Sequence, residues 1–148
     1  MKQSERQKAL SAFQRLRVYQ EAEGEFVKCI SCGKIIHVSE ADGGHYENRK
    51  NRVTELLPEN VHAQCRACNR FHEGNLVAYR NGIEARYGES YAKRLNYIIL
   101  ASKGSSEAYS KLSDEDKRLV VSKKCELEYK VLSKGFRKEL RELKKGLK

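Results

Sequence analysis

Two pairs of cysteines constrain the fold of this chain more than any other feature of its sequence. Cys29 and Cys32 form one C-x-x-C turn, and Cys65 and Cys68 form a second one. Because the two thiolates of such a turn reach a single tetrahedral zinc ion, two turns supply the four ligands of a closed structural site. The spacing therefore predicts a structural Zn²⁺ held by all four cysteines, against the alternative of two unrelated cysteine pairs.

A bound zinc ion would also make up for a small hydrophobic core. Only 33 of the 148 residues are Leu, Ile, Val or Phe, which is close to the composition at which chains become disordered. Zinc contributes an apparent folding free energy on the order of 10–16 kcal/mol in small domains. The fifth cysteine, Cys125, lies on an apolar helical stripe and is expected to pack there.

The charge of the chain indicates the kind of partner it has. The formal net charge is +10 and the isoelectric point is near 9.4, which favours an anionic partner such as nucleic acid. The longest apolar run, residues 97–101, is too short to span a membrane, and the first twenty residues do not resemble a secretory signal. We expect a soluble, cytoplasmic protein that does not bind membranes.

The 32 residues between the two cysteine pairs exceed what a plain zinc ribbon contains. This segment includes Gly43 and Gly44 immediately before His45, and a predicted turn at 58–60. Adjacent glycines allow a close approach of backbone and ligand, so His45 is predicted at the edge of a cleft. Asn69 directly follows the last cysteine and is predicted at the start of a helix whose direction the metal fixes.

This order of motifs resembles the treble-clef HNH nucleases, which carry a ββα-metal motif. Within that group it is most similar to the phage NinG (Rap) recombination proteins, and the layout is also similar to the recombination endonuclease VII class. The segments that carry the resemblance are 16–17, 29–33, 42–46, 60–65, 68–69 and 74–80. The resemblance implies metal-dependent cleavage of branched DNA, such as Holliday junctions and D-loops, in the cytoplasm of a host cell.

The resemblance also implies roles for individual residues. His45 matches the general base, Asn60 the residue that orients the base or braces the loop, and Asn69 the ligand of a catalytic divalent metal. Many HNH enzymes have a metal-binding carboxylate just before the base, where this chain has Gly44. The candidates for the second ligand are Asp42, and His72 on the expectation that it shares a helical face with Asn69.

The chemistry of these residues suits phosphodiester hydrolysis. A neutral imidazole can take a proton from water near neutral pH, and Mg²⁺ binds through few protein oxygens while keeping several waters. The leading hypothesis is therefore a Mg²⁺-dependent endonuclease, with Mn²⁺ able to substitute, that leaves 5′-phosphate and 3′-hydroxyl ends by family analogy. Two alternatives stay open: a non-catalytic zinc-containing protein that binds branched DNA, and a generic HNH enzyme that nicks duplex DNA.

The expected fold is α+β: a zinc-stapled treble-clef domain over residues 1–103, with a helical extension over 104–148. Periodicity predicts a helix up to Glu23, strands at 26–29 and 35–38, and helices around 76–87 and 91–103. A long helix is expected beyond the Ser113 cap, with seven apolar residues at spacings of three or four between 125 and 147. That stripe either packs on the zinc domain or pairs with a second copy in a homodimer. The ten Lys and Arg against four Asp and Glu in 123–148 favour phosphate contacts.

Overall fold

The computed structural model describes residues 2–147 and begins with a long helix, α1 (Glu5–Glu21). Ser4 caps this helix: its hydroxyl accepts a hydrogen bond from the Gln7 backbone N–H, and the Gln7 side chain accepts one from the Ser4 N–H. This reciprocal capping box satisfies two of the free donors at the start of the helix. The helix ends two residues earlier than expected, and the chain turns at Gly24, whose φ is +61°.

Two antiparallel hairpins form the β part of the fold. The first pairs β1 (Phe26–Lys28) with β2 (Ile35–His37) around the first cysteine turn, as predicted. The second pairs β3 (Ala41–His45) with β4 (Val61–Cys65). In this hairpin Ala41 lies opposite Cys65, and His45 lies opposite Val61. The second hairpin therefore has Cys65 of the predicted zinc site at one end and the candidate base His45 at the other.

The sequence did not predict β3, because its residues Ala-Asp-Gly-Gly-His have a low propensity for strands. Packing against α1 explains why glycine is needed there. A Cβ atom on Gly43 would lie 2.3 Å from the backbone oxygen of Gln14. The strand can thus lie directly against the helix backbone, where the Gln14 amide donates to the Gly43 carbonyl at 2.8 Å.

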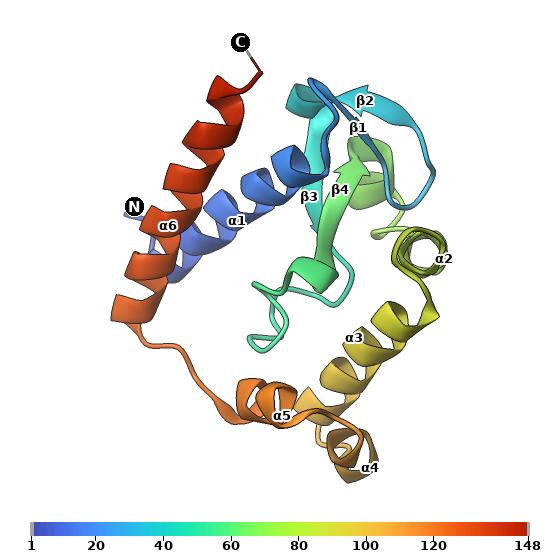
Figure 1. Ribbon diagram of the computed structural model, residues 1–148, viewed down its shortest axis with the longest axis vertical. Coiled ribbons are helices and arrows are strands. Elements are labelled where there is room, and N and C mark those ends of the chain that lie inside the picture. Colours follow the sequence, from blue (N-terminus) through green and yellow to red (C-terminus); the bar gives the residue numbers. More distant parts are fainter. Residues whose placement is uncertain (1, 148) are drawn as a thin grey trace.

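The rest of the chain is helical and surrounds the hairpins (Figure 1). A π-helical turn, η3 (Ala67–Phe71), follows β4 and contains Asn69. The next elements are α2 (Leu76–Tyr87), α3 (Glu89–Ser102) and α4 (Ser106–Ser110), followed by α5 (Asp114–Val121) and α6 (Glu126–Lys145). Short 3-10 turns, η1 (Val38–Glu40) and η2 (Pro58–Asn60), precede β3 and β4. The described chain thus has a mixed α+β fold with a mainly helical C-terminal part.

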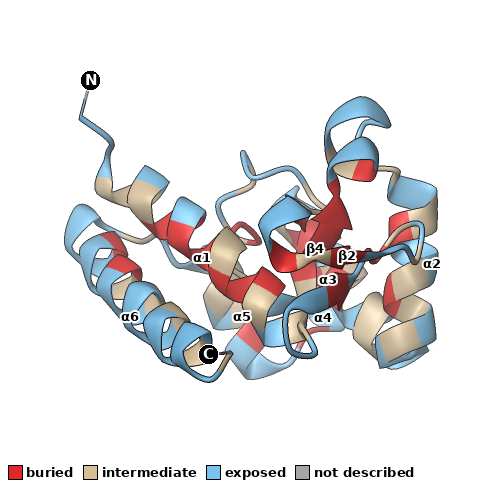
Figure 2. Ribbon diagram, turned by 90° about the horizontal axis from the view of Figure 1, so that it is seen from above, coloured by how far each residue is buried: buried red, intermediate tan, exposed pale blue. Residues whose placement is uncertain are grey.

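The C-terminal stripe packs on α1 within the same chain, and α6 and α1 lie side by side in Figures 1 and 2. The Phe136 ring lies 4.9 Å from the Phe13 ring, and Tyr129 is buried. The expected single long helix is wrong, because residues 122–125 separate α5 from α6. Cys125 is exposed at the start of α6 instead of packing on the stripe. Its backbone N–H donates to the Glu128 carboxylate, an interaction typical of a helix start.

Within residues 2–147, none of the helices combines the length and the apolar composition that crossing a bilayer requires.

Candidate active site and zinc centre

The four cysteines of the two C-x-x-C turns converge in space. Their sulfur atoms all lie within 4.8 Å of one another, and the sulfurs of Cys32 and Cys65 are 3.7 Å apart. Tetrahedral coordination with Zn–S bonds of about 2.3 Å separates the sulfurs by about 3.8 Å. The cluster can therefore hold a zinc ion, as the spacing predicted.

Nearby N–H groups are placed to stabilise thiolates in this cluster. The backbone N–H of Cys32 donates to the sulfur of Cys29, and the backbone N–H of Cys68 donates to the sulfur of Cys65, both at 3.5 Å. The side chain of Asn75 donates to the sulfur of Cys68, also at 3.5 Å. Such outer contacts orient metal ligands and disperse the charge of the thiolates.

His45 lies at the end of β3 with its ring held in one orientation. Its Nε2 atom is 2.8 Å from the backbone oxygen of Glu55. A carbonyl oxygen only accepts hydrogen bonds, so Nε2 must carry the proton and Nδ1 keeps the lone pair in the neutral ring. Burial lowers the pKa of His45 and the charge of Arg49 lowers it further, whereas the hydrogen bond that His45 donates to the Glu55 carbonyl raises it. The ring is therefore neutral, with a free basic nitrogen, at cellular pH.

The residue that holds His45 is itself anchored by two helices. The Glu55 side chain is fully buried. Its carboxylate accepts a hydrogen bond from Arg6 of α1 at 2.9 Å and one from the Tyr129 hydroxyl of α6 at 2.6 Å. Because both carboxylate oxygens are paired, the Glu55 peptide is fixed, and with it the acceptor of the His45 N–H.

Asn69 is oriented by Asp42 of β3. The Asn69 side-chain amide donates to Asp42 at 3.0 Å, which leaves its own oxygen, Oδ1, free to accept. Arg70 donates to both oxygens of Asp42 at 2.9 Å. The Asp42 carboxylate is thus used in pairing with Asn69 and Arg70, so it acts as a positioning group for Asn69.

His45 and Asn69 line one open cleft of about 470 Å³. The other residues of its lining are Gln14, Asn48, Arg49, Glu73 and Gly74. Glu73 has a positive φ of 49° and is exposed at this lining. Among the residues described, no hydrogen bond or ion pair uses its carboxylate. The cleft therefore combines a neutral imidazole, an amide oxygen and a carboxylate.

Two other predicted site residues lie outside this cleft. Asn60 is fully buried, accepts from the Glu47 N–H and donates to the carbonyls of Glu47 and Thr54. It thus braces the loop between β3 and β4, without a hydrogen bond to His45 among the described contacts. His72 lines a different hollow, beside Cys32 and Cys68, so it does not share a face with Asn69. The expected shared face assumed an α-helix, whereas 67–71 form a wider π turn.

Gly44 directly precedes His45, and the structure explains why a larger side chain does not fit there. A Cβ atom at this position would lie 1.8 Å from Oε1 of Gln64 and 3.1 Å from Oδ1 of Asn69. Gln64 is fully buried, and its amide donates to the Ser31 hydroxyl and the Gly74 carbonyl. Within residues 2–147, its Oε1 has no hydrogen-bond donor. The Gln64 side chain thus occupies the space beside Gly44 and links the first cysteine turn to the cleft.

Sequence reasoning missed four residues of this arrangement: Glu55, Gln64, Glu73 and Asn75. Glu73 and Asn75 lie within seven residues of Cys68, and that proximity is a signal that could have found them. No local sequence motif identifies Glu55, because its partners are Arg6 of α1 and Tyr129 of α6, which are 49 and 74 residues away in sequence. Gln64 precedes a zinc cysteine, yet only the register of β3 and β4 reveals its contact with Gly44.

Comparisons with known proteins assign the chain to a family. The sequence model described as NinG: Bacteriophage Lambda NinG protein matches residues 2–145. The Protein ninG of Escherichia phage lambda is 36% identical over 89 residues, which are 56% of this chain and 38% of that protein. The Protein ninG of Salmonella phage P22 is 36% identical over 88 residues, covering 55% of this chain and 37% of its own length.

These matches therefore span little more than a third of each curated relative. No solved structure matches the chain. Since the family model covers nearly all of the sequence, the chain belongs to the NinG family of bacteriophage lambda.

Proposed function

We propose that this protein is a metal-dependent endonuclease of the HNH type that cuts branched DNA during phage recombination. The observation that carries the proposal is the pairing of His45 Nε2 with the Glu55 carbonyl, which leaves a basic nitrogen in the cleft that Asn69 also lines. The order of β3, β4 and the turn carrying Asn69 is compatible with a ββα-metal site.

The proposed reaction is hydrolysis of one phosphodiester bond. Nδ1 of His45 takes a proton from a water molecule, and the water oxygen attacks phosphorus. The bond from phosphorus to the 3′ oxygen breaks, and that oxygen takes a proton from a solvent water molecule, which gives a 3′-hydroxyl and a 5′-phosphate. Arg49, whose charge already acts on His45 in the cleft, is placed to attract the phosphate. The hydrogen bond to Glu55 stabilises the ring after it has accepted the proton.

The oxygen donors of the cleft fit a hard divalent cation. Oδ1 of Asn69 and the carboxylate of Glu73 are the groups that would hold Mg²⁺ or Mn²⁺ there. A bound ion would supply positive charge to the phosphate oxygens as negative charge develops on them. Glu73 takes the place in this scheme that sequence analysis gave to Asp42 or His72, because Asp42 is paired with Arg70.

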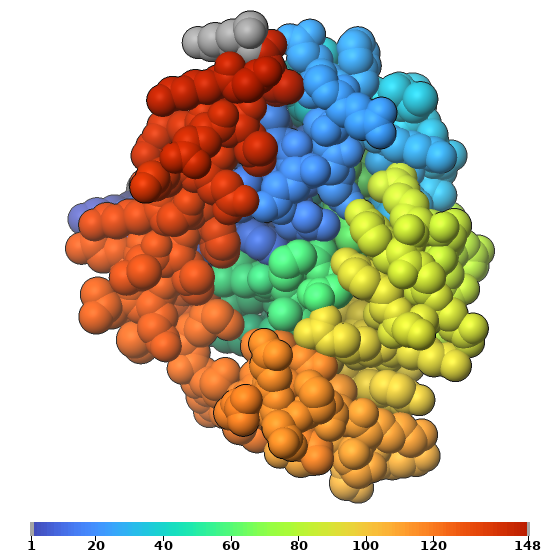
Figure 3. Space-filling model, viewed as in Figure 1, coloured from blue at the N-terminus to red at the C-terminus, as the bar shows by residue number. Residues whose placement is uncertain are grey.

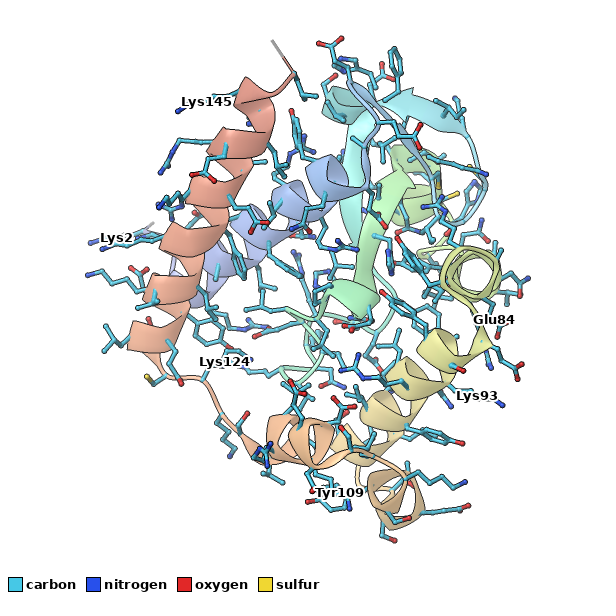
Figure 4. The ribbon with its side chains drawn as sticks, viewed as in Figure 1. Lys2, Glu84, Lys93, Tyr109, Lys124 and Lys145 are labelled. Atoms are coloured by element: carbon cyan, nitrogen blue, oxygen red, sulfur yellow. The ribbon has the colours of Figure 1, made fainter. Side chains whose placement is uncertain are left out.

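The preference for branched DNA rests on the family resemblance together with the charge of the protein. The cations of α6 support it: the outer face of this helix is exposed, and Lys124 and Lys145 stand near its two ends (Figures 2 and 4). We propose that they contact the phosphates of the duplex arms of a junction.

A cleavage panel tests the proposal. Wild type, His45→Ala and Asn69→Ala are incubated with linear duplex, a D-loop and a four-way junction in Mg²⁺, with His37→Ala as the matched control. His37 is half-exposed and lies in β2, outside the cleft. We expect wild type and His37→Ala to cut the branched substrates, and the two cleft variants to lose at least 100-fold in rate. Equal cutting of all three substrates would support a generic nicking enzyme instead.

A second candidate is a non-catalytic protein that binds branched DNA while a partner cuts it. The observation in its favour is that the strand carboxylate Asp42 is paired with Arg70 through both oxygens, and that the residue directly before His45 is Gly44 and not an acid. Binding of the junction by wild type without any cleavage, in Mg²⁺ or Mn²⁺, would select this candidate.

A further inference from the structure

A second feature of the cleft is that it continues along α1. The 470 Å³ cleft shares Gln14, Arg49 and Asn69 with a neighbouring hollow of about 430 Å³. That hollow in turn shares Ser11 and Arg49 with a third one of about 330 Å³, which reaches Gln3. The three hollows thus form one groove, here called the α1 groove, that leads from the start of α1 to His45.

One wall of the α1 groove is a face of the first helix. Arg6, Leu10 and Arg15 of α1 belong to the lining. Its polar uncharged residues are Gln7, Ser11 and Gln14, at spacings of four and three on one side of the helix, and Gln3, which lies four residues before Gln7 and just ahead of the helix. Of these four, Gln3, Gln7 and Ser11 are exposed. Amides and hydroxyls of this kind hydrogen-bond to phosphate and sugar oxygens without reading the base sequence.

The other wall carries positive charge. Arg49 and Lys50 are exposed on the loop between β3 and β4, and within residues 2–147 neither belongs to an ion pair. Arg6 donates to the Arg49 carbonyl at 2.7 Å, and Asn48 accepts from the Lys50 N–H at 2.8 Å. The first contact ties the loop backbone to α1 and the second closes a turn within the loop, so the backbone that carries the two cations is held beside the groove.

Acidic groups do not cancel this charge over most of the groove. The third hollow has no Asp or Glu in its described lining. Among the described residues, the acid that lines the second is Asp42, which Arg70 pairs through both oxygens. Glu73 appears only at the end that contains His45 and Asn69. The charge is therefore positive along the groove and becomes mixed only at the candidate reaction centre.

We propose that the α1 groove binds the phosphate backbone of the DNA strand that is cut and delivers it to His45. This inference rests on the proposed function. The helix rises 1.5 Å per residue, so the face from Gln7 to Gln14 is about 10 Å long and spans roughly three nucleotides. Arg49 lies in all three hollows and contacts the strand along its path, while α6 serves the duplex arms.

The test measures DNA binding apart from cleavage. Arg49→Gln combined with Lys50→Gln is compared with wild type by fluorescence anisotropy on a four-way junction, without added divalent cation and over a range of salt. The matched control is Lys93→Gln combined with Lys111→Gln, which removes the same charge at α3 and just after α4, away from α1 (Figures 1 and 4). Circular dichroism verifies that each variant is folded.

We expect the groove variant to bind at least tenfold more weakly and to lose about 2 from the slope of log K against log salt. The control is expected to keep the wild-type slope within about 0.5. Ser11→Glu, which places a carboxylate in the groove, should also weaken binding. An unchanged slope in the groove variant, or an equal loss in the control, would overturn the inference. Failure of the proposed function looks different, because wild type would then bind through the groove but not cut in Mg²⁺.

Discussion

At the scale of single residues, the buried Gln64 side chain excludes any side chain at position 44, directly before His45. The missing carboxylate before His45 is a steric consequence of the buried Gln64 side chain, because a Cβ at Gly44 would overlap its oxygen. The nitrogen of the same amide group donates to the Ser31 hydroxyl and the Gly74 carbonyl, and these two hydrogen bonds hold the group in place. In the proposed metal site the second oxygen donor is therefore Glu73, the carboxylate that lines the cleft.

The first prediction concerns this overlap. Gly44→Asp, which places a carboxylate directly before His45, should destabilise the protein by about 1–3 kcal/mol because it overpacks a buried site. Gly44→Asp combined with Gln64→Ala should recover part of that loss, because the obstructing amide is gone. Urea unfolding of the two variants measures both effects. Equal stability of Gly44→Asp and wild type would contradict the packing argument.

A second prediction concerns acid stability at one buried carboxylate. Burial raises the pKa of Glu21, but hydrogen bonds from His62, Tyr87 and the Ala63 N–H outweigh it and bring the pKa to about 2. In the unfolded chain the pKa is 4.5. Because the folded pKa is the lower one, the stabilisation is complete above 4.5 and disappears as the pH falls towards 2.

The lowering of the Glu21 pKa from 4.5 to about 2 corresponds to roughly 3 kcal/mol of folding stability at neutral pH. Glu21→Gln should lower stability at pH 7 and flatten its dependence on pH between 4.5 and 2. Glu107→Gln, at an exposed position, serves as the control and should behave like wild type. Chemical unfolding at a series of pH values measures the free energy of unfolding of each variant. If the free energy of Glu21→Gln changed with pH in parallel with that of wild type, the prediction would be wrong.

At the scale of elements, local periodicity predicted most helices but not the second hairpin. The stripe at Leu76, Tyr79, Ile83 and Tyr87 fell on α2, and Gly88 ended it with a φ of +93°. The strands β3 and β4 were missed because their stability comes from contacts with α1 and the zinc cysteines instead of from strand propensity. The break at 122–125 was missed for a similar reason, since the apolar spacing of 125–147 alone does not locate where that helix begins.

In the candidate site, too, the residues in local motifs could be predicted and the contacts between distant segments could not. Its cysteines, His45 and Asn69 could be recognised in sequence because their motifs are short and local. The two hydrogen bonds that hold the Glu55 carboxylate, here called the Glu55 clamp, could not be recognised in the sequence. They join three distant segments: α1, the loop before β4, and α6. In this arrangement the C-terminal helix is linked to the candidate base through two hydrogen bonds, one to the carboxylate of Glu55 and one from His45 to its carbonyl.

The third prediction tests the contribution of α6 to this clamp. Burial, together with the neighbouring Glu55, raises the pKa of Tyr129 to about 12, so its hydroxyl stays protonated and donates. Tyr129→Phe should cost about 1–3 kcal/mol, because a buried carboxylate oxygen loses its donor. It should also slow cleavage about tenfold and move the acid limb of the pH–rate profile, since the acceptor of the His45 N–H is less well held.

Val131→Ala is the control for this variant, because Val131 lies on the same helix and is 63% exposed. It should leave both stability and rate within error of wild type. A Tyr129→Phe variant that is less stable but has the wild-type rate and pH profile would show that the contact serves the fold alone.

At the scale of the molecule, the cysteine cluster joins the two hairpins. Cys29, Cys65 and Cys68 belong to the same buried cluster as Val18 of α1 and Val27 of β1, so their metal would sit at the junction of helix and strands. In Figure 3 the blue surface of the N-terminal part borders the yellow-green surface of α2. A chain with this few large apolar residues depends on such a junction. The fold and the cleft are therefore expected to be lost together when zinc is removed.

The fourth prediction follows from that dependence. Chelation of zinc should lower the melting temperature by well over 10 °C, and Cys68→Ser should have a similar effect, because binding and folding free energies are coupled. Cys125→Ser is the matched control and should be neutral, since Cys125 is exposed and serine is a favourable helix cap. Full stability of the chelated protein, with zinc absent by elemental analysis, would disprove the coupling.

The most direct test of the central claim is the pH dependence of single-turnover cleavage of a four-way junction in Mg²⁺. If His45 is the base, with its pKa lowered by burial and by Arg49, the rate should fall on the acid side with an apparent pKa below 6.5. His45→Ala should lose this acid limb and at least 100-fold in rate. Cleavage by His45→Ala at the wild-type rate, or with the same acid limb, would contradict the account.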